Sequence, residues 1–161
     1  MAPQRKGLTE TQIGAIAENL VGTQLILLSE GRLSPYLTLA DDSGIDLLVR
    51  DKKTGKIASL QVKSRTKSIK GGPTVHFEVR KATFNPNQNA YLLAIFFKLD
   101  ERSIERAWLI PMNKLKSEAK KPRKKLVIRP SIKETSQDKY RAFQCKGMPE
   151  VVSRLKKDLG K

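Results

Sequence analysis

Three polar residues, Asp46, Gln61 and Lys63, have the types and the spacing that suit metal-assisted hydrolysis of a phosphodiester. A carboxylate and an amide oxygen are hard ligands of the kind that Mg²⁺ prefers. A bound metal polarises a phosphate and lowers the pKa of a coordinated water, and a nearby ammonium group offsets charge that develops on the phosphate. These residues therefore predict a site for Mg²⁺ or Mn²⁺.

A hairpin of two strands would bring these groups together. Residues 45–50 and 56–63 read as strands, and the segment between them has turn chemistry. With the turn centred in that segment, antiparallel partners have numbers that sum to 107, so Asp46 lies opposite Gln61. Lys63 falls on the same face because side chains alternate along a strand. The other face is wholly apolar, as a core requires, with Ile45, Leu47, Val49, Ala58, Leu60 and Val62.

A helix over residues 8–28 precedes the hairpin, because apolar residues recur at helical spacing and Thr9 or Thr11 can cap the first turn. Glu18 shares one face of this helix with Gly14 and Gly22, whose small size predicts a close approach to the sheet. The apolar residues of the pattern are Ile13, Ile16, Ala17, Leu20 and Leu27.

The spacing of Asp46, Gln61 and Lys63 resembles the D…(D/E/Q)-x-K core of the PD-(D/E)XK nucleases, which include archaeal Holliday junction resolvases, many restriction endonucleases and some homing endonucleases. The resemblance covers residues 8–98. It implies that Asp46 and Gln61 bind the metal, that Lys63 is the catalytic lysine and that Glu18 is an auxiliary ligand. It also implies a Mg²⁺-dependent endodeoxyribonuclease, and a homodimer or higher homo-oligomer because both strands of a duplex must be cut.

Two positions depart from this family pattern. Gln61 stands where Glu or Asp is usual, and Ile45 stands where a proline usually precedes the aspartate. A glutamine offers a carbonyl oxygen but no charge, so it should hold a metal more weakly than a carboxylate. A nuclease-fold module that binds nucleic acid without cutting it is therefore the alternative interpretation.

The remaining pattern predicts an α/β fold with a restriction-endonuclease-like core, in which helices flank a mixed, mostly antiparallel sheet. The length and the absence of repeats or Gly/Ser linkers indicate one domain over residues 1–161. Further strands are expected at 32–39, 74–80, 90–98, 107–110, 126–129 and 141–145, and further helices at 112–119 and 149–159.

Positive charge is concentrated in the second part of the chain. The net charge is +16, of which residues 1–63 carry +1 and residues 64–161 carry +15. Such an excess favours a polyanionic partner, DNA by the resemblance, although charge alone would also allow RNA. We expect phosphate contacts from residues that follow Lys63 and from a basic loop, which are Ser64, Arg65, Lys67, Lys70, Lys120, Lys121, Arg123, Lys124 and Lys125.

Other potential ligands predict no separate site. A single cysteine, Cys145, excludes an intramolecular disulfide and suits a reducing cytoplasm, and we expect a packed thiol. His76 is the only histidine and reads as an ordinary strand residue, while Asp41 and Asp42 read as a turn. No apolar run approaches the roughly 18 residues of a membrane span, so no membrane partner is expected.

Overall fold

The computed structural model of the protein describes residues 7–40, 43–84 and 87–161. Its framework is a six-stranded sheet with the order β1-β2-β3-β5-β6-β8, in which β3 and β5 are parallel and all other neighbours are antiparallel. The predicted α/β class and the mixed, mostly antiparallel sheet are confirmed. The strands are β1 (Leu33–Leu37), β2 (Leu47–Asp51), β3 (Ile57–Arg65), β5 (Ala90–Lys98), β6 (Ser103–Pro111) and β8 (Gln144–Cys145).

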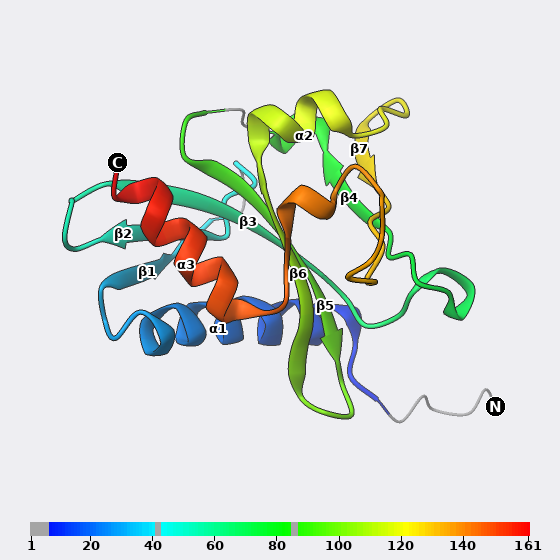
Figure 1. Ribbon diagram of the computed structural model, residues 1–161, viewed down its shortest axis with the longest axis horizontal. Helices are drawn as coiled ribbons and strands as arrows, with labels where there is room; N and C mark the ends of the chain where they lie inside the picture. Colours follow the sequence, from blue (N-terminus) through cyan, green and yellow to red (C-terminus); the bar gives the residue numbers. More distant parts are fainter. Residues whose placement is uncertain (1–6, 41–42, 85–86) are drawn as a thin grey trace.

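Helices and a second, two-stranded sheet cover the two faces of the main sheet. One core contains α1 (Glu10–Leu28) and α3 (Met148–Leu159), and the other contains α2 (Met112–Glu118) and the antiparallel pair β4 (Phe77–Arg80) and β7 (Lys125–Ile128). Figure 1 shows α2, β4 and β7 together at the top, and α1 and α3 together at the lower left. Short 3-10 turns span Ile69–Gly71, Lys81–Thr83 and Arg141–Phe143.

The central strand β5 is buried from Ala90 to Phe97 because both faces of the sheet are covered at this position. Its sequence is therefore a continuous apolar run, and its predicted bounds, 90–98, are those observed. β5 runs parallel to β3, so the chain must cross over between them, and β4 lies in that crossover. No helix within the described ranges combines the length and the apolar composition needed to cross a bilayer.

The hairpin has the predicted register. Leu47 lies opposite Leu60, and Val49 lies opposite Ala58, so the partner numbers sum to 107. These four residues are buried, whereas Leu48, which points to the opposite face, is exposed. The turn chemistry and the alternation of apolar and polar residues were therefore sufficient to predict the pairing of β2 with β3.

Helix α1 begins at Glu10, two residues after its predicted start, with Thr9 as the predicted cap, and it buries a different face. Thr9 and Gln12 form a capping box at its start. Its core residues are Ala17, Val21 and Leu25, which are four residues apart, whereas Ile16 and Leu27 are exposed, contrary to expectation. A Cβ at Gly14 would contact nothing, and one at Gly22 would make only ordinary contact with Pro35. The expectation that both glycines permit a close approach was therefore wrong.

The bounds of several predicted strands differ from those observed. β2 begins at Leu47 rather than at residue 45, so Asp46 precedes the strand and the ladder of β2 with β3 ends at Leu47 and Leu60. Three other strands differ more. β4 begins at Phe77 rather than at residue 74, and β6 extends over nine residues where four were expected. Of residues 141–145, only the last two form a strand, and Arg141–Phe143 form a 3-10 turn. β8 pairs only at Cys145 and Gln144, so tertiary packing rather than local pattern sets its length.

Candidate active site

Asp46 is fixed to strand β3 by a hydrogen bond between its side chain and the backbone. Its Oδ2 accepts the N–H of Val62 at 2.6 Å, and its own N–H donates to the carbonyl of Leu60 at 2.9 Å. Val62 is the residue between Gln61 and Lys63. The bond is charge-assisted and short, so it holds the carboxylate beside the two other predicted residues of the site.

Gln61 is buried, with 5% of its surface exposed, on the opposite side of β3 from α1. Its Oε1 is buried and has no hydrogen-bond partner in the described part of the chain. A buried carbonyl oxygen without a partner costs about 1–3 kcal/mol, so native structures rarely retain one without a reason. The amide oxygen lies on the strand that holds the Asp46 carboxylate, and both are hard oxygen donors of the kind that Mg²⁺ accepts. The donor set therefore fits a divalent ion.

Glu18 and Lys63 lie in one cleft. Its volume is about 730 Å³, and its walls come from the first half of α1, from the end of β3 and from the end of β4. Glu18 is contributed by α1, Lys63 by β3 and Arg80 by β4. Val62, which holds the Asp46 carboxylate, also lines the cleft, so this bond connects Asp46 to the wall that bears Lys63.

Arg80 was not predicted as a site residue, although it lines the cleft with Lys63. It is the last residue of β4, is exposed and has no ion-pair partner in the described part of the chain. Its only sequence signal was its place at the end of the strand expected at 74–80. That signal was insufficient because the position of β4 depends on its pairing with β7, 45 residues further along.

Gly44 fixes the segment that leads into Asp46. It has a φ of +68°, and a Cβ at this position would lie 2.6 Å from the carbonyl oxygen of Thr83. Thr83 belongs to the 3-10 turn that follows Arg80, and its hydroxyl donates to the Arg80 carbonyl at 3.3 Å. Only glycine permits this contact, which places the approach to Asp46 against the turn that follows Arg80.

The predicted nucleic-acid contacts fall into two groups that flank this cleft. Ser64 and Arg65 line the cleft itself, whereas Lys67 and Lys70 are exposed on the loop that follows. The basic loop 120–125 is anchored at Lys81, the neighbour of Arg80. Lys81 donates its N–H to the carbonyl of residue 124 at 2.9 Å, and its Nζ donates to the carbonyl of residue 123 at 3.0 Å. The exposed loop side chains are Lys120, Lys121, Arg123, Lys124 and Lys125.

Lys125 differs from the other cations of this loop because an acid neutralises it. Its Nζ lies 2.7 Å from Oε2 of Glu78, and Oε1 of Glu78 lies 2.9 Å from His76. The hydrogen bonds from Lys125 and His76 lower the pKa of Glu78 to about 2. Arg129 donates to Nδ1 of His76 at 3.2 Å, so His76 belongs to a surface network rather than to the cleft.

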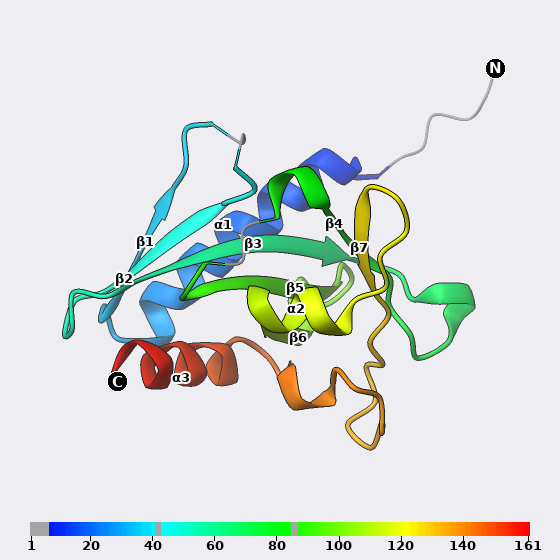
Figure 2. The ribbon, with the colours of Figure 1, turned by 90° about the horizontal axis from the view of Figure 1, so that it is seen from above.

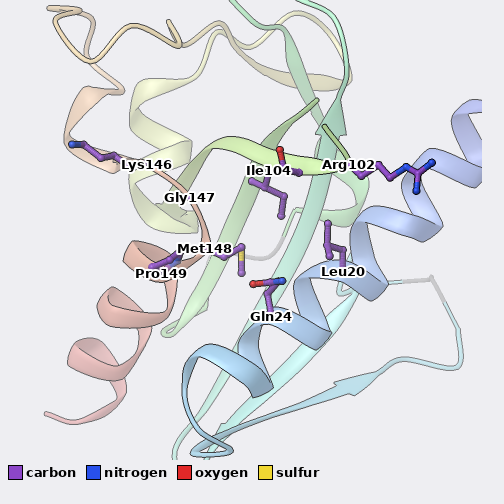
Figure 3. A pocket seen from close by; sticks show the side chains of 9 residues that line it. Leu20, Gln24, Arg102, Ile104, Lys146, Gly147, Met148 and Pro149 are labelled. Atoms are coloured by element: carbon purple, nitrogen blue, oxygen red, sulfur yellow. The ribbon is translucent and has the colours of Figure 1, made fainter. Parts of the chain in front are cut away.

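A second cleft, of about 320 Å³, lies between α1, the β5–β6 turn and the start of α3. Figure 3 shows Arg102 and Lys146 at its margins, with Gln24 and Met148 between α1 and α3. None of the described residues that line it is acidic. It therefore lacks the carboxylate that a Mg²⁺ site requires.

The remaining potential ligands do not add to the site. Cys145 is fully buried, and burial raises the pKa of its thiol to about 11, as expected for a packed cysteine. Within the described ranges, no three side chains of the His, Cys, Asp and Glu types cluster as a metal site. The predicted metal site pairs the carboxylate of Asp46 with the amide of Gln61, so it does not require three side chains of these four types. Asp41 and Asp42 lie outside the described residues.

Comparison with known proteins shows the architecture. No family model matches the chain, and no curated protein matches it. Among solved structures, the bacterial homing endonuclease I-Ssp6803I superposes with a TM-score of 0.61 and 16% sequence identity, over 94% of this chain and 95% of that chain. The chain shares the fold of a homing endonuclease. The match covers nearly all of both chains.

Proposed function

We propose that this protein is a metal-dependent endonuclease of the PD-(D/E)XK type that acts on DNA. The proposal rests on the 2.6 Å bond from Val62 N–H to the Asp46 carboxylate, which ties that carboxylate to the backbone of the residue between Gln61 and Lys63 in the sequence. The homing endonuclease fold supports the same reaction class by analogy. The orphaned Gln61 oxygen supports the requirement for a metal.

In this proposal Asp46 and Gln61 would hold Mg²⁺ or Mn²⁺. Glu18, on α1, lines the neighbouring cleft, which Asp46 and Gln61 do not line, and is the auxiliary ligand that the resemblance implies. The ion would supply an activated water and polarise the phosphate. Val62 keeps the Asp46 carboxylate in one orientation through its N–H. Lys63 lines the cleft, where its ammonium group would offset the charge of a bound phosphate.

The DNA backbone would run from this cleft onto the basic loop 120–125. Arg65 and Arg80 provide cations in the cleft, and Lys81 ties the basic loop to the residue next to Arg80. Contacts of this kind position a duplex without reading its sequence, and they make the affinity strongly dependent on salt.

Binding without cleavage is the second candidate, and the neutral side chain of Gln61 favours it. A glutamine leaves the metal site with one negative charge fewer than a second carboxylate would provide. In that case the basic surface would bind nucleic acid, and the hairpin would retain only the architecture of a nuclease.

Cleavage of supercoiled plasmid DNA tests the proposal. Purified protein should convert the plasmid to nicked or linear forms with Mg²⁺ or Mn²⁺ and should be inactive in EDTA. Lys63→Ala should lose cleavage and keep DNA affinity. Lys156→Ala is the matched control, because it removes a lysine from α3 rather than from the cleft. Salt-sensitive DNA binding by a wild-type protein that cleaves no plasmid, branched or single-stranded DNA would favour the second candidate. Preferential binding of structured RNA over duplex DNA would contradict the DNA assignment.

A further inference from the structure

The two-stranded sheet of β4 and β7 has one face in the core and one face towards the surface. Phe77 and Val79 are buried, and Glu78 and Arg80 alternate with them, so their side chains point away from the core. We call this second side of the sheet the outer face. Its side chains come from β4, from β7 and from the residue next to each strand, and they are His76, Glu78, Arg80, Lys125 and Arg129.

A chain of hydrogen bonds on the outer face orients Arg129. Its Nε donates to Nδ1 of His76 at 3.2 Å, so Nδ1 is an acceptor and the proton of a neutral ring lies on Nε2. Nε2 of His76 lies 2.9 Å from Oε1 of Glu78, and Oε2 of Glu78 accepts from Nζ of Lys125 at 2.7 Å. The guanidinium of Arg129 is therefore held by His76, which is held in turn by Glu78.

The two terminal nitrogens of Arg129 can donate to a partner outside the chain. Arg129 is exposed, and its Nη1 and Nη2 make no hydrogen bond or ion pair with the residues that the structure describes. A guanidinium presents its N–H groups in one plane, where they match O6 and N7 of guanine in the major groove of DNA. Because Nε is already anchored, less side-chain freedom is lost on binding.

The outer face continues directly from the candidate active site. Arg80 lines the cleft that contains Lys63, and His76 lies four residues before it, a distance of about 13–14 Å along a strand. One turn of DNA is about 34 Å long, so a duplex that occupies the cleft also reaches Arg129. Figure 2 shows β4 and β7 side by side next to the end of β3, which forms another wall of this cleft.

Glu78 favours a groove of DNA, rather than its phosphate backbone, as the partner of the outer face. It is the only acid among the five side chains of this face, and its hydrogen bonds keep it ionised. A carboxylate repels phosphates, so a surface that contacted only phosphates would be weakened by it. Base edges in the major groove offer amino donors as well as acceptors, so a carboxylate is compatible with them.

We propose that Arg129 recognises a guanine in the major groove of the DNA target and that His76 is its positioning residue. Arg129 donates from Nη1 and Nη2 to O6 and N7 of the base. Lys125 and Glu78 complete the support, since they fix the side of His76 that faces away from Arg129. The inference rests on the proposed function for its DNA partner and does not depend on cleavage.

Selection from a library of randomised duplexes tests this role without cleavage, because the bound fraction can be recovered in EDTA and sequenced. Wild-type protein should enrich a motif in which one guanine is preferred about tenfold over the other bases. Arg129→Lys keeps the charge and loses the planar fork, so the preference should disappear at that position alone. His76→Ala should relax the same position, because Arg129 loses its anchor. Arg102→Lys, on the exposed β5–β6 turn, is the matched control and should leave the motif unchanged.

Fluorescence anisotropy separates a base contact from a phosphate contact. Arg129→Ala should weaken binding of the selected duplex about tenfold and should weaken binding much less when the preferred guanine is replaced. Equal weakening for both duplexes would assign Arg129 to a phosphate and overturn the inference. A wild-type protein without sequence preference, or an Arg129→Lys variant that selects the wild-type motif, would also overturn it.

Plasmid cleavage separates failure of this inference from failure of the proposed function. If the guanine preference depends on Arg129 but no plasmid is cleaved with Mg²⁺ or Mn²⁺, the recognition role stands and the nuclease proposal fails. If plasmid is cleaved and the motif is independent of Arg129, the nuclease proposal stands and the recognition role fails. A protein that binds no duplex DNA would overturn both.

Discussion

The carboxylate of Asp46 accepts the backbone N–H of Val62 at 2.6 Å, so a side chain before β2 is bonded to the middle of β3. This bond has a structural and a chemical consequence. It closes the hairpin at the end distant from its turn, and it fixes the position of a charged carboxylate of the kind that binds Mg²⁺.

Asp46→Asn should separate these two consequences. The amide oxygen can still accept the Val62 N–H, so the free energy of unfolding should fall by no more than about 1 kcal/mol. The negative charge is lost, so Mg²⁺-dependent cleavage should fall at least about a hundredfold while DNA affinity is kept. Urea unfolding and a cleavage time course check the two parts. Cleavage at the wild-type rate would show that the Asp46 charge has no part in the reaction.

Substitutions of Gln61 can either remove its oxygen or add a negative charge, and both test its role as a metal ligand. Gln61→Met removes the orphaned oxygen at similar volume, so it should leave stability unchanged or raise it by about 1 kcal/mol while abolishing cleavage. Gln61→Glu should preserve or raise activity, and its melting temperature should rise more on addition of Mg²⁺ than that of wild type, because a buried carboxylate requires a cation. A loss of stability in Gln61→Met would mean that the amide has a structural partner.

The Gly44 contact predicts a steric cost beyond the cost of the backbone conformation. Gly44→Ala places a methyl group 2.6 Å from the Thr83 carbonyl oxygen and should destabilise the protein by about 2–4 kcal/mol. Gly55→Ala is the matched control: φ is +75° there and the added methyl group meets open space, so only about 1 kcal/mol should be lost. Equal losses in urea unfolding would show that the 44–83 contact does not constrain the chain.

The ion pair between Arg32 and the buried Asp51 predicts how stability depends on pH. The hydrogen bond from Arg32 lowers the pKa of Asp51 from 3.8 to about 2. A carboxyl group with a depressed pKa stabilises the fold above its unfolded pKa, and this stabilisation, about 2 kcal/mol, is lost as pH falls from 3.8 towards 2.

Urea unfolding of Asp51→Asn at several pH values checks this prediction. The variant should be less stable than wild type at pH 6, and the difference should shrink as the pH falls below 3.8. Glu101→Gln alters an exposed pair with Lys98 and should have little effect at either pH. A difference between wild type and Asp51→Asn that does not vary with pH would contradict the assignment.

The two lysines at the end of the basic loop should differ in their contribution to nucleic-acid binding. Lys124→Ala should lower the slope of log K against log salt concentration by about one, as loss of one phosphate contact does. Lys125 is paired with Glu78, so Lys125→Ala should change the slope less. Fluorescence anisotropy with a labelled duplex over a range of salt concentrations measures both slopes. Equal slopes would indicate that the Glu78 pair opens on binding.

Local pattern was sufficient to predict the hairpin and the central strand. The register of β2 and β3 followed from the turn and from alternation, and the bounds of β5 followed from its apolar run. Both signals are local. Strand pairing across a tight turn produces an alternation of apolar and polar residues, and burial on both faces produces a continuous apolar run.

Contacts between distant segments could not be predicted in the same way. Arg80 reaches the cleft because β4 pairs with β7, and Gly44 is required because Thr83 packs against it. Neither relationship has a periodic signal. The exposed side of α1 was also misjudged, because Ile16 and Leu27 fit a helical pattern but face away from the core. Such apolar residues are uninformative until the packing of the helix is known.

Anomalous diffraction from crystals soaked in Mn²⁺ tests the metal site most directly. We expect a peak bonded to a carboxylate oxygen of Asp46 and to Oε1 of Gln61, at about 2.0–2.3 Å from each, which disappears in Asp46→Asn. Mn²⁺ bound only elsewhere, or a peak that persists in that variant, would contradict the claim that this hairpin holds the catalytic metal.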